Sequence, residues 1–327
     1  MFKLGIIGTG TISHEFIQAA HSSHAYQLRA VYSRRLETAE QFAEPYENVQ
    51  LFDDLQAFLA SDLDVVYIAS PNSLHFAQAK QVLQAGKHAI IEKPAVTSPD
   101  QWQELMNLVN ERKLYLFEAA RNYHEAAFEV IADFLKDKTV LGAHFTYAKY
   151  SSKMPDLLAG KEPNVFSSRF AGGALMDLGI YPIYAAVRLF GQPQEALYQA
   201  QQLENSIDLN GTGQLLYSDF QVTIFTGKNI TSNLQAEIYT SQGTLTLNGI
   251  ERVSSAIFQS HDGQVTGLDL HVANHQMLEE ASAFARYMQG QASEHYQKSL
   301  KDAAHVHESL AAMRTHAGIH FEEENHA

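Results

Sequence analysis

The sequence predicts an α/β protein of two domains: first a doubly wound parallel sheet, then a domain built on an antiparallel sheet. Three observations carry this prediction. The chain has 327 residues, and typical domain sizes of roughly 100–200 residues favour two domains over one. In the first third, strand-length and helix-length segments alternate. After about residue 137, strand-length segments follow one another through turns.

The first domain, placed at residues 1–120, is expected to be a Rossmann-type unit. Its apolar, strand-length runs lie near residues 2–7, 28–33, 64–69, 88–92 and 114–119. Helix-length segments lie between them, at 12–22, 35–44, 73–85 and 98–111. Ser98 is expected to cap the last helix, with Pro99 at its first position. Strands that alternate with helices predict a parallel sheet covered on both faces.

The second domain, placed at residues 121–327, is expected to be mainly an antiparallel sheet. Its strand-length segments lie near 141–151, 193–204, 212–217, 220–227, 234–240, 243–248 and 252–259. Turn residues such as Asn248-Gly249 separate consecutive strands. Helices are expected near 173–190, 273–289 and 299–317. The acidic tail at 322–326 is expected to be a solvated end.

Composition narrows the class of protein. Asp and Glu outnumber Lys and Arg by 37 to 23, and the resulting charge of −14 opposes binding to nucleic acid or anionic membranes. The chain has no cysteine, which excludes disulfides and thiolate metal sites, and no other residue spacing predicts a metal site. We find no signal peptide and no apolar run of the roughly 18–20 residues that a membrane span requires. These features predict a soluble, cytoplasmic protein.

A glycine-rich turn follows the first expected strand and opens the first expected helix. Gly8 permits a tight turn, and Gly10 permits close approach of the backbone to a pyrophosphate at the helix N-terminus. Ser13 stands where the third glycine of such fingerprints is usual, and a small side chain is tolerable there. An ordinary glycine turn is the alternative, but the place in the first strand–helix unit favours a dinucleotide site. The residues expected to bind are Gly8, Thr9, Gly10, Thr11 and Ile12.

The end of the second expected strand indicates which dinucleotide is bound. NAD-binding folds usually place Asp or Glu there, to bind the ribose 2′-hydroxyl. This chain has Ser33-Arg34-Arg35 instead, and a hydroxyl followed by guanidinium groups suits a 2′-phosphate. Surface charges that open a helix are the alternative. We expect NADP to be preferred over NAD, with Ser33 and Arg34 as the binding residues.

Three further motifs accompany the glycine turn. Ser70-Pro71-Asn72-Ser73-Leu74-His75 follows the expected strand at 64–69, and Glu92-Lys93-Pro94 follows the next one. Gly172-Gly173-Ala174-Leu175-Met176-Asp177-Leu178-Gly179-Ile180-Tyr181 lies in the second domain. In order and spacing the set resembles the Gfo/Idh/MocA oxidoreductase family over nearly the whole chain. The Asp-Leu-Gly-Ile-Tyr form resembles the branch of glucose–fructose oxidoreductase and dimeric dihydrodiol dehydrogenase.

This resemblance implies a fold, a reaction and a partner. The fold is a Rossmann domain followed by an α/β domain with a large, open, predominantly antiparallel sheet, which commonly forms a homodimer interface. The reaction is reversible hydride transfer between NAD(P) and a hydroxyl or carbonyl carbon of a small molecule. A sugar, a cyclic polyol and a dihydrodiol remain open as substrates, and so does the physiological direction.

Three residues are expected to carry the proton chemistry. Lys93 lies just past the carboxyl end of a parallel strand, where open α/β sheets bind ligands. Pro94 keeps it out of helical backbone, and the sequence leaves open whether the Lys93–Pro94 bond is cis. Asp177 and Tyr181 are four residues apart, on one helix face. The resemblance implies that Tyr181 donates and accepts the proton and that Asp177 orients substrate or the Tyr–Lys pair; Lys93 is then the electrostatic partner of Tyr181.

Two distortions are expected in the same helical segment. Pro182 lacks the N–H that would bind the Leu178 carbonyl, so it should kink the helix. Gly179 costs about 1 kcal/mol relative to Ala in a helix interior. The alternative interpretation of the segment is a packed amphipathic helix with Tyr181 half buried.

Other site residues follow from the resemblance. It places Asn72 and His75 near the ribose and nicotinamide and gives Glu92 a contact with the cofactor or with Lys93. The cofactor-binding residues expected around these loops are Ser70, Pro71, Asn72, His75, Glu92 and Lys93. The chain departs from the family pattern at Ala171, where glycine is common, and at Glu125, where proline is frequent.

The substrate side is less specific. Arg121 falls where a large side chain often borders the substrate in the family, but a surface pair with Glu118 is the alternative. The loop Ser152–Arg169 is expected to shape specificity. Its basic residues Lys153, Lys161 and Arg169 leave an anionic substrate open.

Two other function classes compete with an enzyme. A regulatory or sensor protein on the same fold would bind a dinucleotide without turnover, and a scaffold would have lost its cofactor. A pure binder has no need of Lys93, Asp177 and Tyr181 together, so their presence favours the enzyme.

Overall fold

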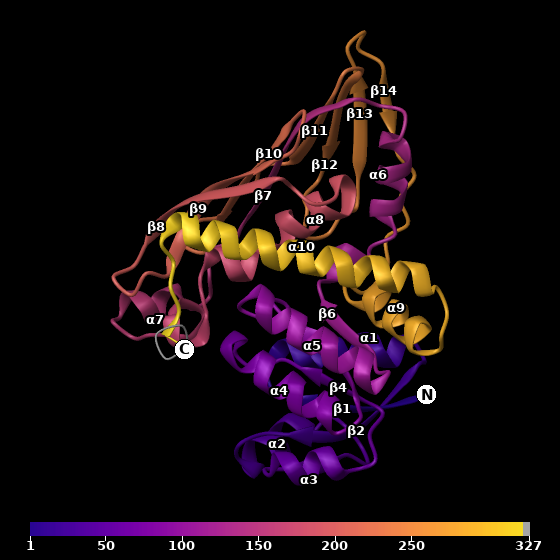
Figure 1. Ribbon diagram of the computed structural model, residues 1–327, viewed down its shortest axis with the longest axis vertical. Coiled ribbons are helices and arrows are strands. Elements are labelled where there is room, and N and C mark those ends of the chain that lie inside the picture. Colours follow the sequence, from indigo (N-terminus) through magenta and orange to yellow (C-terminus); the bar gives the residue numbers. More distant parts are fainter. Residues whose placement is uncertain (323–327) are drawn as a thin grey trace. The chain divides into compact units, whose positions relative to one another are not determined.

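The structure is a computed structural model, and it describes residues 1–322 (Figure 1). The chain forms two compact units, which we describe separately. The first holds residues 1–119 and 273–300, and the second holds residues 120–272 and those from 301 onward. The expected solvated tail lies outside the described residues beyond Glu322.

The first unit contains a six-stranded sheet in the order β3-β2-β1-β4-β5-β6. Every pair of neighbouring strands is parallel. The strands are β1 (Phe2–Ile7), β2 (Tyr26–Tyr32), β3 (Gln50–Phe52), β4 (Val65–Ile68), β5 (His88–Glu92) and β6 (Leu116–Ala119). Buried Val, Ile and Leu residues dominate the central strands, as two-sided burial requires. The short strand β3 was not expected, because three partly exposed residues give no clear apolar run.

Helices accompany this sheet. They are α1 (Thr11–Ser22), α2 (Leu36–Ala43), α3 (Leu55–Ala60), α4 (Asn72–Gln84), α5 (Pro99–Arg112) and α9 (Leu278–Met288). Four of them, α1, α2, α4 and α5, lie at the places expected for the first domain. Ser98 caps α5 as predicted, since its hydroxyl accepts a hydrogen bond from the Gln101 backbone N–H at 3.4 Å. Helix α3 was not expected; Asp54 caps it by accepting from the Ala57 N–H at 2.7 Å.

Residues 273–300 correct the expected domain division, because they pack on the first unit. The hydroxyl of Tyr26 donates to the Ala281 carbonyl at 2.9 Å. Phe117 on β6 stacks on Phe284 of α9, with ring centroids 4.6 Å apart. These contacts bury apolar surface that the parallel sheet would otherwise expose, and sequence order gives no sign of this return of the chain. Helix α10 (Ser293–Ala317) contributes its residues up to Leu300 to the first unit and the rest to the second.

The second unit contains an eight-stranded sheet in the order β14-β13-β12-β11-β7-β10-β9-β8. The strands are β7 (Val140–Ala148), β8 (Glu195–Gln202), β9 (Asp208–Leu216), β10 (Gln221–Gly227), β11 (Ala236–Thr240), β12 (Gly243–Leu247), β13 (Ala256–Ser260) and β14 (Val265–Gly267). One pair, β7 with β10, is parallel, and the other pairs are antiparallel. The prediction of an open, predominantly antiparallel sheet is confirmed. Figure 1 shows β8 at one edge and β14 at the other.

One face of this sheet is buried and the other is partly exposed. In β11, β12 and β13 buried residues alternate with more exposed ones. The helical segments of the unit are η1 (Arg121–His124), α6 (Ala127–Leu135), α7 (Met154–Leu158), η2 (Asn164–Phe166), η3 (Ser168–Phe170), η4 (Leu175–Gly179), α8 (Ile180–Phe190) and the rest of α10. Most of α8 is buried, including Ile180–Val187.

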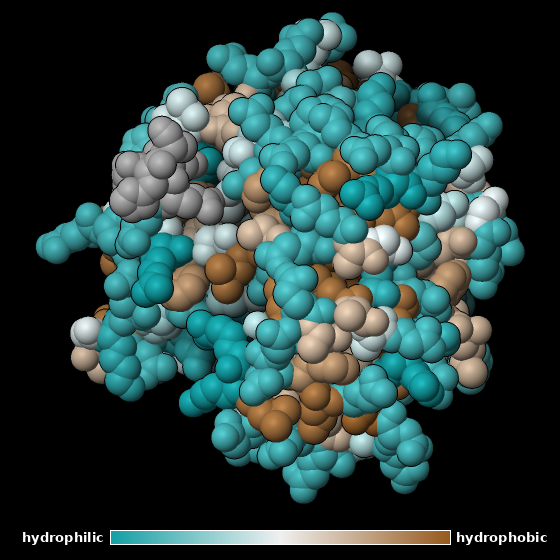
Figure 2. Space-filling view, turned by 60° about the horizontal axis from the view of Figure 1, so that its bottom comes forward, coloured by the Kyte–Doolittle hydropathy of each residue, from teal (hydrophilic) through white to brown (hydrophobic). Residues whose placement is uncertain are grey.

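One apolar segment corrects the expectation that no stretch has the length of a membrane span. Residues Ser168–Phe190 reach that length with a mean hydropathy of 1.3, but 89% of the apolar window is buried in the fold. The core helix of a soluble protein has the same character. The face of the molecule in Figure 2 is mainly hydrophilic, with hydrophobic side chains in small groups among polar ones.

Candidate functional site

The glycine turn after β1 has the backbone that its sequence requires. Gly8 has φ +102°, and a Cβ atom there would lie 2.4 Å from the Ala69 carbonyl oxygen. No atom lies within 4 Å of the corresponding position on Gly10, which is exposed. Ser13 donates its hydroxyl proton to the Gly8 carbonyl at 2.7 Å and closes the turn. The serine in place of the third glycine therefore supports the turn rather than disrupting it.

This turn suits an anionic ligand at the N-terminus of α1. Gly10 is the N-cap residue, and no side chain caps the helix there. The first turn of α1, which the structure describes completely, carries no acidic side chain. Backbone N–H groups and the helix dipole at such an end favour a phosphate. Thr11 and Ile12 are exposed beside Gly10, so the residues present fit the pyrophosphate of a dinucleotide.

The loop after β4 lies beside this turn, because β1 and β4 are neighbours and the strand order reverses between them. Ligands bind at such a switch point, outside the carboxyl ends of the strands. Ser70 donates its hydroxyl proton to Gln78 at 2.7 Å. Pro71 is the N-cap residue of α4 and Asn72 its first residue. Sequence motifs at two adjacent strand ends therefore meet at one edge of the sheet.

His75 is buried in α4 rather than displayed on the surface, with 1% of its area exposed. Its Nε2 lies 2.7 Å from the Ser70 carbonyl oxygen and its Nδ1 lies 2.9 Å from the Pro94 carbonyl oxygen. Burial lowers the pKa of His75, although both carbonyls oppose this shift. The ring bridges the loop after β4 and the turn after β5.

The turn that contains Lys93 follows β5, and buried carboxylates lie next to it. The Lys93–Pro94 peptide bond is cis, one of the two forms that the sequence left open. Glu118 on β6 is 6% exposed and accepts a hydrogen bond from the Ala95 N–H at 2.8 Å. Glu118 is therefore a buried residue and not the surface residue of the alternative interpretation of Arg121. A carboxylate inside the apolar run Leu116–Ala119 was the signal that sequence reasoning misinterpreted.

Glu92 lies on the neighbouring strand end and is also buried, with 7% exposed. It accepts a short hydrogen bond from the hydroxyl of Tyr67 on β4. Tyr67 in turn stacks on Phe16 of α1, with ring centroids 3.9 Å apart. This contact anchors the strand end from which Lys93 projects.

The end of β2 places Ser33, Arg34 and Arg35 between that strand and α2. The Ser33 N–H donates to the Phe52 carbonyl at 3.0 Å. Arg34 is exposed, and Arg35 is the N-cap residue of α2. The end of β2 is the place where dinucleotide-binding sheets recognise the ribose. No carboxylate occupies these three positions.

In the second unit, Asp177 lies within a widened helical turn and Tyr181 lies just after it. Residues Leu175–Gly179 form a π-helix, η4, which continues directly into α8. The expected kink at Pro182 therefore takes the form of a π turn just before it. Four residues make slightly less than one turn of a π-helix, so Asp177 and Tyr181 keep neighbouring directions. π turns within helices are frequent at functional sites.

Tyr181 is 8% exposed and sits among groups from other elements. The Arg121 guanidinium lies 5.3 Å from its ring centroid. Tyr147 of β7 contacts the ring edge-on, with centroids 5.2 Å apart. Asn122 donates from Nδ2 to the Tyr181 carbonyl at 3.1 Å and to the Ile250 carbonyl at 3.2 Å. The expected pairing of Lys93 with Tyr181 joins the two units and stays a prediction.

Sequence reasoning missed Lys228, which pairs with Asp177. Lys228 follows the end of β10 and donates from Nζ to Asp177 Oδ2 in a short ion pair. The Lys228 side chain is 4% exposed and that of Asp177 is 32% exposed. The Lys228 ammonium also lies 5.8 Å from the ring centroid of Phe166. A lysine after the apolar run 220–227 was visible in the sequence, but nothing there connected it with Asp177.

A second carboxylate anchors the start of the same helix. Asp208 is 1% exposed and accepts hydrogen bonds from the Leu175 N–H at 2.8 Å and the Tyr198 hydroxyl at 2.7 Å. Burial raises the pKa of Asp208. Gly173 has φ +116°, and a Cβ atom there would meet Asp208 at 2.2 Å. The absence of a side chain at Gly173 therefore leaves room for the Asp208 carboxylate, which binds the Leu175 N–H in the first turn of η4.

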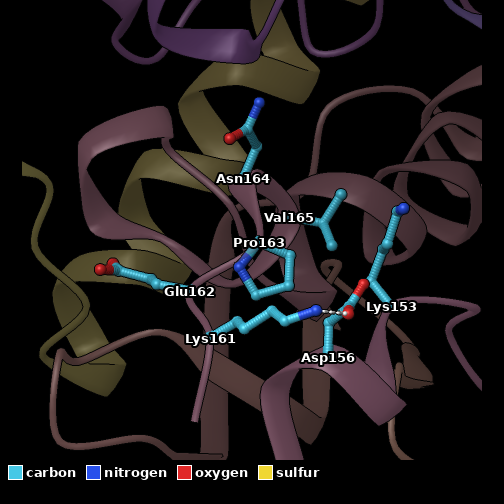
Figure 3. A pocket seen from close by; sticks show the side chains of 7 residues that line it. All are labelled: Lys153, Asp156, Lys161, Glu162, Pro163, Asn164 and Val165. Carbon is cyan, nitrogen blue, oxygen red and sulfur yellow. Dashed lines mark hydrogen bonds and ion pairs between the residues drawn. The ribbon is translucent and has the colours of Figure 1, made fainter. Parts of the chain in front are cut away.

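The expected specificity loop lines an open pocket of about 520 Å³ (Figure 3). Its lining residues are Lys153, Asp156, Lys161, Glu162, Pro163, Asn164 and Val165. Figure 3 shows Lys161 joined to Asp156, at 2.8 Å, while Glu162 points away from that pair. The hydrogen bond between them raises the pKa of Lys161 and lowers that of Asp156. Of the basic residues of this loop, Lys161 is thus paired with a carboxylate.

The remaining predicted substrate residue lies outside this lining. Arg169 is exposed, and its guanidinium lies 5.4 Å from the Phe170 ring centroid. Among the described residues, no group of three or more His, Asp or Glu side chains gathers as a metal site.

Comparison with family models gives matches in both halves of the chain. A model described as the oxidoreductase family with an NAD-binding Rossmann fold matches residues 2–120. A model described as the GFO/IDH/MocA C-terminal domain matches residues 139–246.

Relatives of known sequence are similar along most of the chain. An uncharacterized oxidoreductase of Escherichia coli (strain K12), YgjR, is 35% identical over 287 residues, 87% of this chain and 88% of that protein. The scyllo-inositol 2-dehydrogenase (NADP(+)) IolU of Bacillus subtilis (strain 168) is 32% identical over 321 residues, 98% of each chain. Among solved structures, KijD10, a 3-ketoreductase from Actinomadura kijaniata crystallised with NADP and TDP-benzene, has a TM-score of 0.82 at 23% identity. The match covers 97% of this chain and 98% of that one, and it shows a shared fold.

Proposed function

The chain belongs to the Gfo/Idh/MocA family of oxidoreductases, and from this premise we propose that it is an NADP-dependent dehydrogenase or reductase of a cyclic polyol or sugar. The observation that carries the proposal is the cluster around Tyr181. A phenol and a carboxylate lie there beside two cations, Arg121 and Lys228. Such a set suits the transfer of a proton that leaves negative charge on the phenol oxygen.

The first unit supplies the cofactor site in this proposal. The turn Gly8–Ile12 holds the pyrophosphate, and Ser33 and Arg34 hold the 2′-phosphate of NADP. The loops that contain Asn72 and Lys93 border the nicotinamide half. His75 acts by positioning the loops to which its ring is bound, at the Ser70 and Pro94 carbonyls. Glu92 acts by fixing the end of β5 through its hydrogen bond with Tyr67. When bound, the nicotinamide supplies or accepts the hydride.

The proton is handled by the chain's own residues. Tyr181 donates a proton to the substrate oxygen during reduction and accepts it during oxidation, and Lys93 is its electrostatic partner. Asp177 orients the substrate hydroxyl groups. A phenol ordinarily releases its proton near pH 10, so cations nearby are needed for this role near neutrality.

The substrate class follows from the loop pocket and the relatives. The pocket lining carries two lysines and two carboxylates, which favours an uncharged, hydroxyl-rich compound over an anion. IolU is named for scyllo-inositol and NADP, and this supports a cyclic polyol.

Two further parts of the proposal concern assembly and location. We propose a cytoplasmic homodimer formed through the partly exposed face of the second sheet. Register places Tyr239, Ile257 and Val265 on that face, with 37%, 47% and 65% exposed. Light scattering should give twice the chain mass of 36.4 kDa, and Ile257→Asp should shift it to one chain mass.

Replacing Tyr181 by phenylalanine tests the catalytic assignment. Tyr181→Phe should lower kcat for NADP-dependent oxidation of scyllo-inositol by roughly 10²- to 10⁴-fold, because general acid–base catalysis contributes that much. Its affinity for NADPH, measured by fluorescence titration, should be unchanged. The matched control is Tyr184→Phe, on the same helix and 2% exposed, which should keep its activity. Near-normal turnover by Tyr181→Phe would reject Tyr181 as the acid.

A panel of substrates separates the enzyme from the competing function. Inositols, aldoses and dihydrodiols should be tested in both directions with NADP(H) and NAD(H). Turnover of at least one compound is expected. Tight NADPH binding without turnover of any compound would favour the regulatory or sensor protein instead.

A further inference from the structure

The ion pair between Lys228 and Asp177 is unusual for its burial. A lysine side chain is rarely as buried as 4% exposed, because removing an ammonium group from water is costly. Lys228 is also far from Asp177 in sequence, 51 residues away. Its backbone is fixed on both sides, since its N–H donates to the Leu209 carbonyl at 2.7 Å and its carbonyl accepts from the Ser151 N–H at 2.8 Å. The ammonium is therefore held at one place.

The surroundings of Tyr181 define which charges bear on its hydroxyl group within the second unit. Asp177 precedes it on the same helix, and Lys228 reaches Asp177 from the end of β10. Arg121 of η1 lies over the Tyr181 ring, and Tyr147 of β7 meets the ring edge-on. In the proposed function Lys93 adds a cation from the first unit. Asp177 is thus the one anion among the groups named here.

This arrangement has a direct electrostatic consequence for proton transfer. When Tyr181 gives up its proton, the phenol oxygen becomes negative, and a carboxylate nearby opposes that change. An ammonium bound to the carboxylate cancels most of its charge. The Lys228 side chain is 4% exposed and lies beside the buried ring of Phe166, so the compensation is screened less by solvent.

We propose that Lys228 is a positioning residue for the reaction: it holds Asp177 in place and compensates its charge, so that this carboxylate does not oppose proton transfer at Tyr181. The inference rests on the proposed function of Tyr181. It assigns a role to a residue that lies in none of the motifs of the family resemblance. It also gives Asp177 a fixed orientation from which its carboxylate can meet a substrate hydroxyl.

The test is the pH dependence of kcat/KM for oxidation of scyllo-inositol by NADP⁺, where Tyr181 must accept a proton. Lys228→Met leaves the carboxylate uncompensated, so the limb on which activity rises should move to higher pH by about one unit or more. Activity at a fixed pH below that limb should then fall about tenfold. Asp177→Asn removes the anion and should move the limb to lower pH. The double variant Asp177→Asn/Lys228→Met should return it towards the wild-type position.

These opposite shifts separate electrostatic compensation from a merely structural role. If Lys228 had only a structural role, Lys228→Met would lower the folded fraction or kcat without moving the pH limb. Adding Asp177→Asn would then not restore the folded fraction or kcat. Equal limb positions in all variants would overturn the proposal. Lys228→Arg keeps the charge and should keep the wild-type limb. If Lys228→Met does not fold, the shift in Asp177→Asn and its reversal in the double variant decide the question.

A second readout does not depend on turnover. Ultraviolet titration of tyrosinate, with Tyr181→Phe subtracted, isolates the ionisation of Tyr181 in the intact chain. The same subtraction in the Lys228→Met background should show ionisation at higher pH. If no compound is turned over yet this shift is found, the proposed function fails while the compensation by Lys228 stands. If turnover is found and neither the titration nor the limb moves, the role of Lys228 fails alone.

Discussion

The turn that carries Lys93 and the helix that carries Asp177 and Tyr181 are built in different ways. The turn that contains Lys93 is held through backbone groups of its loop: His75 lies between the carbonyls of Ser70 and Pro94, and Glu118 accepts from the Ala95 N–H. Asp177 is bound by a side chain, that of Lys228, from a strand end 51 residues later.

This difference explains why one region is easier to recognise than the other. A site held by backbone at strand ends needs only short motifs in a fixed order, and such motifs are visible in one sequence. A site held by side chains from separate elements, here the π-helix η4 and the end of β10, depends on the tertiary fold being formed. We therefore expect substitutions around Asp177 in the second unit to lower stability and activity together. In the first unit, we expect some substitutions to weaken cofactor binding without lowering stability.

The largest effect is expected at Phe166, which follows the pocket-lining residue Val165 and lies beside Lys228. Its side chain is fully buried, and Phe→Ala in a core costs about 3–5 kcal/mol. Phe166→Ala should therefore lower the free energy of unfolding by that amount in urea titrations, and it should also reduce turnover. Leu158→Ala, in the same loop and 75% exposed, is the matched control and should change the stability little. A loss under 1 kcal/mol at Phe166 would contradict the interdependence of loop and helix.

The two glycines of the first turn should separate stability from binding. Gly8→Ala combines a positive φ with a contact of 2.4 Å to backbone, so it should lower the free energy of unfolding by roughly 2–3 kcal/mol. Gly10→Ala meets no atom within 4 Å, so its stability should be nearly unchanged. Both should weaken NADPH binding in fluorescence titrations, because both approach the pyrophosphate. Normal NADPH affinity in Gly10→Ala would reject this turn as the pyrophosphate site.

A smaller effect is expected at the end of β2. Arg34→Ala should reduce the preference for NADPH over NADH about tenfold, equivalent to about 1.4 kcal/mol, since a charge-assisted contact to the 2′-phosphate is lost. Parallel titrations at one salt concentration measure the ratio. Arg29→Ala makes the same change in net charge on β2, where Arg29 acts on Asp62, and should leave the ratio unchanged. A ratio that Arg34→Ala does not alter would reject the 2′-phosphate assignment.

The smallest effect is expected at His75 and is visible in pH dependence. Burial lowers the pKa of His75 below its usual 6.5, so the neutral ring stabilises the fold above about pH 6.5. That contribution is lost as the pH falls through the lowered pKa. His75→Gln should cost about 1 kcal/mol at neutral pH, as one hydrogen bond is weakened. Unfolding free energies measured between pH 5 and 8 should show a flatter acid slope in the variant, and an unchanged slope would exclude His75 as its origin.

Most elements, and the motifs that make up the candidate site of the first unit, could be predicted from the sequence because they depend on local properties. These local properties are the tight turn at Gly8, the helix cap at Ser98 and the apolar runs of the strands. Each can be recognised from the sequence without knowledge of the tertiary structure. The return of residues 273–300 to the first unit depends on tertiary packing of Phe284 on Phe117, which no local pattern records. Lys228 was missed for the same reason. The π turn at Leu175–Gly179 was anticipated only as a kink, because Pro182 shows that a hydrogen bond is absent but not how the backbone adjusts.

The parallel pairing of β7 with β10 has a consequence for how the second sheet forms. On one side of β7, strands β8, β9 and β10 make a meander of local hairpins, and on the other side β11 to β14 make a second one. Only β7 joins the two, through pairings with β10 and β11 that are distant in sequence. Each meander can assemble early from near neighbours, whereas their union waits for loop closure onto one strand. A destabilising substitution in β7 would therefore slow formation of the whole sheet, whereas one in β14 would affect only the edge of the sheet.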